Sequence, residues 1–410
     1  MLSRSMMIIV AALTVSVGPV SADVLTDWNE KTAALVTPRM APAAGGRVVA
    51  MVQVAMFDAI NSIDRRYRPY HVQLPAAADT SKDAAAAAAA AAVLAGVLAD
   101  AQADVNSAAA TWLAKLPDGQ AKATGIALGQ AVAAKILAAR ADDGADAPDS
   151  YRPRTTPGVY VPTPITVSST WPNVRPFGLT SPSQFRAPAP VALASEEWAK
   201  DYKEIKALGA KTSRERSPRQ TEDARFWIIT GPQSTEPVVR QIVAAKKMEL
   251  VDAARFMALT AVAAADAAIA VMDAKYHYNF WRPITAIRNG DIDGNAATEP
   301  EATWQPIDNT PMHPEYPCAH CIVSMAVAAA VEEALGTADI PEVAMTSPTA
   351  PGVTHRWTNA RAWADEVAYA RIWAGFHYRF SVRAGQQMGR EIGTYAVRNL
   401  MPPAGVASTR

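Results

Sequence analysis

Apolar residues recur at three-to-four-residue spacing over two long parts of the chain. GRVVAMVQVAMFDAINSI, which begins at Gly46, shows this spacing, and it is typical of a helix with one buried face. The run from Asp83 to Leu116 is dominated by alanine, the best helix former. Its flanks, VLAGVLADAQADV and TWLAKL, favour packed helices over low-complexity disorder. Long helical patterns return from about Thr221 to Leu400. We therefore predict helices on both sides of a central segment.

The central segment, residues 144–220, has a different character. It is dense in proline with interspersed aromatic residues, as in YRPRTTPGVYVPTPITVSSTWPNVRPFGL. Proline interrupts helices, and the aromatic residues argue against a simple flexible linker. We expect an ordered, irregular loop segment over the surface of a helical body, closed by a short helix at SEEWAKDYKEIKALG.

These patterns predict a mainly α fold. Sustained period-two alternation rich in β-branched residues is scarce in the sequence. The predicted organisation is an N-terminal helical region at 23–143, the proline-rich irregular segment at 144–220 and a C-terminal helical region at 221–400. The candidate chemistry lies in this last region.

The first 22 residues have the features of a signal peptide. MLSR supplies positive charge, SMMIIVAALTVSVG is an apolar run, and VSA provides small residues for cleavage after Ala22. A membrane anchor would need a longer run, roughly 20 apolar residues. We expect export to the periplasm or beyond the cell, where paired thiols can oxidise.

The rest of the chain, about 388 residues, can bury a large core. Its 39 basic and 39 acidic residues balance in the full sequence, which does not suggest nucleic acid or an anionic membrane surface as a partner. The most apolar stretch, FMALTAVAAADAAIAVM, contains Asp266 and suits a packed helix better than a membrane span. We expect no integral membrane segment in the mature chain, and an oligomer is compatible with the sequence.

The first candidate segment is KYHYNFWRPITAIR. Lys275 and Arg282 lie seven residues apart at the end of an apolar helix predicted from about Val238. Seven residues make nearly two turns, so both cations could share one helical face. Pro283 also makes a helix boundary near Arg282 plausible, in which case Arg282 lies where the chain changes direction.

The second segment, PMHPEYPCAHCIVSM, contains two of the chain's six histidines and both of its cysteines. Its prolines make the first half irregular, and a helical pattern begins after Pro317. Cys318, Ala319 and His320 are therefore predicted at a helix N-terminus, where free N–H groups and the helix dipole attract an anion.

The third segment is ARIWAGFHYRFS, with Arg371, Gly375 and His377. Helical spacing would bring these three residues toward a common side. The alternative is a single amphipathic helix with a buried histidine. Together, the three segments offer cations, a helix N-terminus and histidines, a set that suits a tetrahedral oxyanion.

These segments resemble the three-part signature shared by vanadium-dependent haloperoxidases and type 2 phosphatidic acid phosphatase-like acid phosphatases. The match comprises Lys275 with Arg282, the sequence PCAH in place of the family's PSGH, and Arg371 with His377. VAMFDAINSI and WPNVRPFGL further resemble the soluble bacterial haloperoxidase-like branch. The resemblance implies helical bundles with the anion site in the C-terminal part.

The resemblance also implies roles for individual residues. Lys275, Arg282, Arg371 and the backbone N–H of Ala319 would hold the oxygens of vanadate or phosphate. His377 would ligate vanadium or, in a phosphatase, become the phosphohistidine. His320 would be the acid/base group. His313 would contact the residues that hold the oxyanion and would not contact the oxyanion itself.

The sequence departs from the family pattern at Cys318, where the family's serine donates a hydrogen bond to the oxyanion. A thiol is a poorer donor, and a thiolate would repel the anion. A disulfide between Cys318 and Cys321 would leave the position neutral, and the alternative is two reduced, buried cysteines. Ser381 replaces an aspartate that orients the ligating imidazole in the family, so we expect Ser381 or a backbone carbonyl to do so.

We predict an exported vanadate enzyme that oxidises halide, bromide foremost, with hydrogen peroxide. A soluble acid phosphatase acting on a phosphomonoester through a phosphohistidine is the alternative. A non-catalytic oxyanion-binding protein, or a zinc site of His313, Cys318, His320 and Cys321, remains a second alternative. Haem attachment would need a histidine directly after the second cysteine, where Ile322 stands, and a thioredoxin-like enzyme would need a βαβ pattern.

Overall fold

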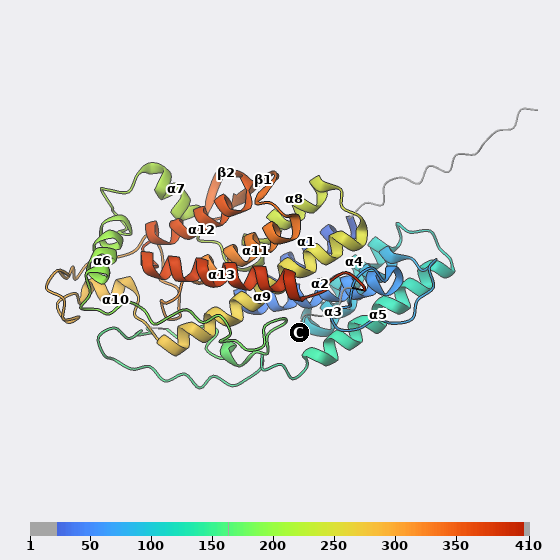
Figure 1. The fold of residues 1–410 in the computed structure, drawn as a ribbon, viewed down its shortest axis with the longest axis horizontal. Helices are drawn as coiled ribbons and strands as arrows, with labels where there is room; N and C mark the ends of the chain where they lie inside the picture. The colour runs from blue at the N-terminus through green and yellow to red at the C-terminus, as the bar shows by residue number, and fades with distance from the viewer. Residues whose placement is uncertain (1–22, 163, 406–410) are drawn as a thin grey trace, which may run out of the picture.

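The computed structural model describes residues 23–162 and 164–405 (Figure 1). The signal peptide predicted at 1–22 lies outside the described residues. Within them the α-helices are α1 (Asp23–Val36), α2 (Pro42–Asp64), α3 (Lys82–Val97), α4 (Gln102–Leu113), α5 (Gln120–Arg140), α6 (Glu196–Leu208), α7 (Pro218–Phe226), α8 (Glu236–Lys246), α9 (Leu250–Tyr278), α10 (Pro283–Arg288), α11 (Ala319–Leu335), α12 (Ala360–Trp373) and α13 (Arg379–Asn399). Short 3₁₀ helices cover Ala99–Ala101, Trp171–Asn173 and Gly231–Ser234.

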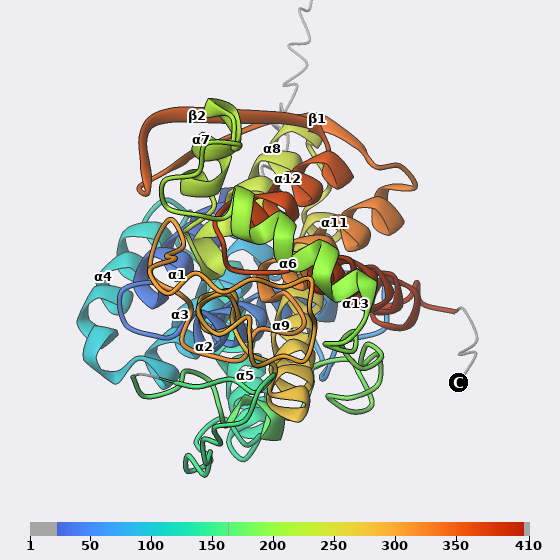
Figure 2. The same cartoon turned by 90° about the vertical axis from the view of Figure 1, so that its left-hand side faces the viewer.

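The mainly α prediction is confirmed, although it missed one hairpin. Strands β1 (Asp339–Ser347) and β2 (Ala350–Asn359) pair antiparallel, with Val343 opposite Trp357. The hairpin packs on α8, α7 and α12 at the outside of the helical body (Figure 2). Its alternation of buried and exposed residues is short and interrupted by register shifts, so a search for sustained period two did not detect it.

Turns interrupt two of the predicted helical stretches, of which only the second was predicted as a single helix. The alanine-rich run from Asp83 breaks after Val97, and α4 begins at Gln102 after a 3₁₀ turn. The long helix predicted from Val238 is also two helices, because α8 ends before Lys247, which has the left-handed φ of 49°. Turns of this kind change the direction of the chain, but the three-to-four-residue spacing of apolar residues continues on either side of them.

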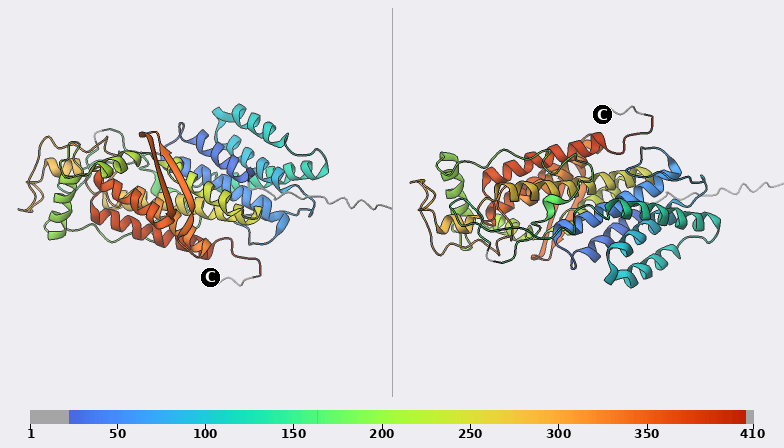
Figure 3. Two further views of the ribbon diagram at one scale, coloured as in Figure 1. Left: turned by 90° about the horizontal axis from the view of Figure 1, so that it is seen from above. Right: turned by 90° about the horizontal axis from the view of Figure 1, so that it is seen from below.

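The helices α2, α9, α11 and α13 form the centre of the molecule (Figure 3). Close approach of α11 and α13 depends on three glycines four residues apart in α13, Gly385, Gly389 and Gly393. A Cβ at Gly389 would meet Ile322 O at 2.3 Å. This contact fixes the position of α11, whose N-terminus carries His320.

The alanine-rich helix α3 packs against α5 in the N-terminal part. Ser81 caps α3 by accepting a hydrogen bond from the N–H of Ala84 at 3.2 Å. Gly129 of α5 lies against α3, where a Cβ would meet Ala85 O at 2.2 Å. The polyalanine run is therefore a close-packed helix surface, as its flanking residues predicted.

The proline-rich segment is ordered, and α6 corresponds to the short helix expected at its end. Asp266, in the middle of α9, is 1% exposed and accepts backbone hydrogen bonds from Phe177, Gly178 and Leu179 at 2.6–3.0 Å. A buried carboxylate needs such donors to offset its desolvation. Asp266 thus fastens the irregular segment to the central helix.

Among the described residues, α2 and α9 are long and apolar enough to cross a membrane by length and composition. In both, 83% of the apolar window is buried inside the protein. Such burial is the property of core helices in a folded domain.

Candidate oxyanion site

Lys275 lies in the last turn of α9 and is fully buried. Its Nζ donates to the carbonyls of Pro314 and Glu315 at 2.9 and 2.7 Å. Burial, followed by the charge of Arg282, holds the pKa of Lys275 well below its usual value. Lys275 therefore attaches the segment before α11 to the end of α9. Its two hydrogen-bond partners are neutral carbonyl groups, which do not balance its positive charge.

Arg282 lies beyond α9, so the alternative in which it shares a helical face with Lys275 is wrong. The helix ends at Tyr278 because Asn279 adopts a left-handed φ of 51°, and Arg282 is the N-cap of α10. Its Nε donates to His313 O at 2.8 Å, and its Nη1 donates to Phe376 O at 3.0 Å. Arg282 consequently joins all three segments that were singled out in the sequence.

A helix end separates Arg371 from His377, so the reading as one continuous helix is wrong. The N–H of Phe376 donates to Arg371 O at 3.1 Å, and that of Gly375 donates to Ile372 O at 2.9 Å. Gly375 has a φ of +79°, and these bonds form a Schellman motif. The turn brings His377 out of the helical path and places its Nε2 3.2 Å from Arg282 Nη1.

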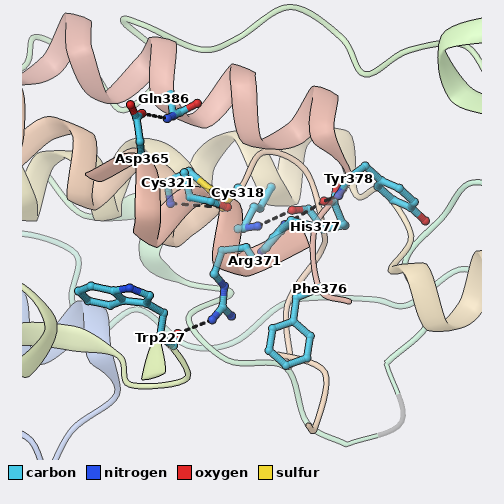
Figure 4. The surroundings of a disulfide bond; sticks show 12 residues. Trp227, Cys318, Cys321, Asp365, Arg371, Phe376, His377, Tyr378 and Gln386 are labelled. Atoms are coloured by element: carbon cyan, nitrogen blue, oxygen red, sulfur yellow. Dashed lines mark hydrogen bonds and ion pairs between the residues drawn. A yellow bond between two sulfur atoms is a disulfide. The ribbon is translucent and has the colours of Figure 1, made fainter. Parts of the chain in front are cut away.

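Arg371 extends from α12 toward Trp227 (Figure 4). Its Nη1 donates to Trp227 O at 2.6 Å, while its buried Nε has no hydrogen-bond partner in the described protein. Burial, followed by the charge of Arg282, lowers the pKa of Arg371 to about 9. An unsatisfied guanidinium N–H in such a place suits an anionic ligand.

Cys318 is the N-cap of α11 and is disulfide-bonded to Cys321 (Figure 4). The bonded sulfur has no S–H, and it accepts from the N–H of Cys321 at 3.2 Å. The N–H of Cys318 donates to Ser381 O at 3.3 Å. Cys318, included above among the oxyanion-binding residues, therefore directs no donor toward an oxyanion. The N–H groups of Ala319 and His320, in the first turn, have no preceding-turn carbonyl to bond.

The histidines are held neutral. Burial, followed by nearby cations, keeps the pKa values of His313, His320 and His377 well below their usual value. His320 Nε2 lies 2.9 Å from Ile229 O. Because a carbonyl only accepts, Nε2 carries the proton, and Nδ1 is left with a free lone pair. His313 Nδ1 lies 3.0 Å from Arg282 Nη2, which places His313 directly beside the cationic group.

Glu315 is a residue of the site that the sequence interpretation missed. Its Oε1 lies 2.8 Å from His377 Nδ1 and accepts from the N–H of Tyr378 at 3.1 Å. Burial raises the pKa of Glu315 to about 7, opposed by Lys275 and Arg282. The group that orients the His377 imidazole is therefore this carboxylate. Ser381 was expected in that role, but its buried Oγ makes no hydrogen bond within the described residues.

The charges of the site favour an anion. Lys275, Arg282 and Arg371 are at most 1% exposed, and Glu315 is the buried carboxylate among them. Three buried cations against one buried carboxylate leave an excess of positive charge, and after burial the charge of Arg282 is what lowers the pKa of both Lys275 and Arg371. A tetrahedral oxyanion would supply the missing counter-charge and meet the free donors.

A mainly apolar cavity of about 150 Å³ lies beside the cationic group. His313, Ala319 and His320 reach it from one side, while α2 and α9 supply apolar walls that include Val49 and Met272. The three cations and His377 are not among its lining residues. His320 thus lies between the cavity and the deeply buried charges.

Comparisons with known proteins agree with this geometry. Residues 255–403 match the model of the VCPO second helical-bundle domain. The vanadium chloroperoxidase of Curvularia inaequalis is 30% identical over 140 residues, which are 29% of this chain and 23% of that protein. The match therefore spans about a quarter of the curated relative.

Solved structures share the whole fold. The first bacterial vanadium-dependent iodoperoxidase superposes with a TM-score of 0.80 at 23% identity, covering 94% of this chain and 99% of that one. A holo-type bacterial vanadium-dependent chloroperoxidase gives 0.71 at 17% identity, covering 90% and 93%.

The fold and the buried charges define a helical protein with a candidate oxyanion-binding site. The chain is therefore similar to vanadium-dependent haloperoxidases in two respects: residues 255–403 match the VCPO second helical-bundle domain, and the chain shares the fold of two bacterial vanadium-dependent peroxidases.

Proposed function

We propose that the protein is a vanadate-dependent haloperoxidase that oxidises halide, with bromide as the foremost substrate, at the expense of hydrogen peroxide. The observation that carries the proposal is the environment of His377. Its Nε2 lies against Arg282, its Nδ1 is held by Glu315, and burial keeps the ring neutral. A neutral, oriented imidazole within a cationic group is what vanadate needs from a protein ligand.

The residues of the site fit vanadate. Lys275, Arg282, Arg371 and the N–H of Ala319 would hold its oxygens, and His377 Nε2 would ligate the metal. Bound vanadate supplies a Lewis-acid centre that polarises peroxide for attack by halide. The protein's own part is to neutralise the anion, orient the imidazole through Glu315 and limit water around the buried groups.

His320 is proposed as the acid/base group. Its Nε2 is fixed by Ile229 O, so its Nδ1 takes the proton that leaves hydrogen peroxide when peroxide binds. The depressed pKa of His320 keeps Nδ1 unprotonated at neutral pH. The adjoining cavity supports a path for peroxide and halide to this imidazole.

We also propose that the protein is exported. The disulfide between Cys318 and Cys321 supports this location, because such bonds persist in oxidising compartments. The signal-peptide pattern in the first 22 residues supports it independently.

Phosphatase activity is the second candidate, since phosphate shares the shape and charge of vanadate. A neutral His377 Nε2 beside Arg282 could attack a phosphomonoester and form a phosphohistidine. The zinc alternative at His313, Cys318, His320 and Cys321 loses both thiolates to the disulfide.

The test is bromide oxidation by vanadate-loaded protein in the presence of peroxide, followed as bromination of a phenolic dye. We expect turnover in the wild type and its loss, by at least about 10³-fold, in His377→Ala, because the metal ligand is removed. His277→Ala, which changes an exposed histidine, should keep wild-type turnover. Absence of bromide oxidation alongside hydrolysis of a phosphomonoester would favour the phosphatase instead.

A further inference from the structure

A second cluster of ligand-type side chains lies where α7, β2 and α12 meet. Atoms of Glu222, Asp223 and His355 lie within 4.8 Å of one another. Asp223 and His355 are 5% and 3% exposed, whereas Glu222 is at the rim. None of these three residues belongs to the oxyanion site described above.

The tautomer of His355 is set by Glu366 of α12. Nδ1 of His355 lies 2.6 Å from Glu366 Oε1, and the same carboxylate accepts from the indoles of Trp227 and Trp357 at 3.0 and 3.1 Å. Indole N–H groups only donate, so the Glu366 carboxylate is the acceptor in both contacts, and at 2.6 Å from its Oε1 the Nδ1 of His355 is the donor.

The other ring nitrogen is directed at carboxylates. Nε2 of His355 lies 3.3 Å from Glu222 Oε1 and 3.8 Å from Asp223 Oδ1. The ring is held in this orientation by Phe226, which stacks on it at a centroid distance of 4.0 Å. Without a proton on Nε2, the ring would offer a lone pair where these carboxylate oxygens converge, so an ion there would meet three electron-pair donors.

The cluster also has an excess of negative charge. Glu222, Asp223 and Glu366 share one arginine, Arg219, whose Nε lies 2.8 Å from Asp223 Oδ1 and whose side chain is 58% exposed. The buried Oδ1 of Asp223 nevertheless makes no hydrogen bond that meets normal geometry. A divalent cation beside a neutral His355 would balance the three carboxylates together with Arg219.

We propose that Glu222, Asp223 and His355 bind one divalent transition-metal ion, with zinc as the best fit. Imidazole with two carboxylates suits zinc, whereas calcium and magnesium prefer all-oxygen ligand sets. Glu366 acts outside the ligands, as the acceptor that fixes His355. Approach of the three ligand atoms, which lie within 4.8 Å of one another, and displacement of Arg219 would complete the site.

The proposed site is connected to the oxyanion site through Trp227. The indole N–H of Trp227 donates to Glu366, and its carbonyl accepts from Arg371. Two residues further on, Ile229 O fixes His320. A bound ion would hold this segment in place and thereby stabilise the positions of Arg371 and His320. The metal site itself does not depend on which oxyanion chemistry the protein performs.

Calorimetric titration of the chelator-treated, full-length protein with zinc chloride tests the proposal. We expect one saturable equivalent, with calcium chloride giving no comparable binding. Glu222→Gln, at the rim of the cluster, should weaken zinc binding by at least about tenfold, and Glu366→Gln by about 10–100-fold. Arg219→Ala should tighten it, because a competing cation is removed.

Two histidine variants separate this site from others. His277→Ala removes an exposed imidazole and His320→Ala removes one from the oxyanion site; both should keep the zinc equivalent. Loss of zinc binding in either variant, or unchanged binding in both Glu222→Gln and Glu366→Gln, would overturn the proposal. So would the absence of saturable binding in the wild type. These results are read without peroxide or halide, so they are independent of the proposed oxidation.

Discussion

At the scale of single residues, the main finding is that the imidazole-orienting carboxylate comes from an unexpected place. The departure from the family at Ser381 indicated that a carboxylate was missing, yet Glu315 occupies the role from the loop before α11. The position of Glu315 could not be predicted from the sequence, because HPEYP shows neither helical nor strand periodicity. Only the fold brings Glu315 next to His377. A glutamate between two prolines beside a predicted anion site was the available signal.

Glu315→Gln is expected to weaken vanadate binding by about 10–100-fold, as loss of a group that orients a metal ligand typically does. The folded-state pKa of Glu315 is raised to about 7, so the carboxylate is ionised above that pH and protonated below it. The advantage of wild type over Glu315→Gln should therefore be largest above pH 7 and shrink as pH falls through about 7. Vanadium NMR titration at several pH values measures both effects.

Glu215→Gln is the matched control, since Glu215 is exposed. It should leave vanadate affinity unchanged at every pH. An affinity of Glu315→Gln equal to that of the wild type across this range would show that the carboxylate does not assist His377.

At the scale of elements, the apolar period located the helices but not their ends. The turns at Lys247, Asn279 and Gly375 depend on left-handed residues, and two of these are not glycine, so composition gave little warning. The turn at Gly375 matters most for the site, because a continuous helix would have carried His377 away from Glu315. The predicted helix N-terminus at Cys318 to His320 is present, since Pro317 marks it in the sequence.

Packing of α13 on α11 gives a stability prediction. Gly389→Ala should destabilise the protein by about 1–3 kcal/mol, because its Cβ would meet Ile322 O at 2.3 Å and push the helices apart. Gly46→Ala is the matched change in α2, where a Cβ meets nothing within 4 Å. It should stabilise by about 0.5–1 kcal/mol through the unfolded state and helix propensity. Urea unfolding of both variants measures the difference, and equal effects would contradict the packing argument.

At the scale of the whole molecule, the order and spacing of three distant segments predicted the cationic group, and Arg282 joins them in the fold. The sequence did not reveal that Trp227 and Ile229, just beyond α7, hold Arg371 and His320 through backbone carbonyls. Backbone contacts leave no residue-type signature, so only the folded chain displays them.

The excess of buried positive charge predicts that oxyanions stabilise the fold. A ligand at 100 times its Kd stabilises the folded state by about 2.7 kcal/mol, so vanadate and phosphate should both raise the Tm. Arg371→Ala should remove most of this shift, because an unpaired donor and a buried charge are lost. Thermal unfolding with and without each anion measures it; a wild-type Tm that does not respond would count against an anion site.

The central claim is that His377 Nε2 is the ligand of a bound vanadate. A crystal structure of the protein grown with orthovanadate tests it most directly, because anomalous scattering locates vanadium. The account predicts vanadium bonded to His377 Nε2, with Lys275, Arg282 and Arg371 around its oxygens and Glu315 still on Nδ1. Vanadium bound elsewhere, or a site that stays empty at saturating vanadate, would contradict it.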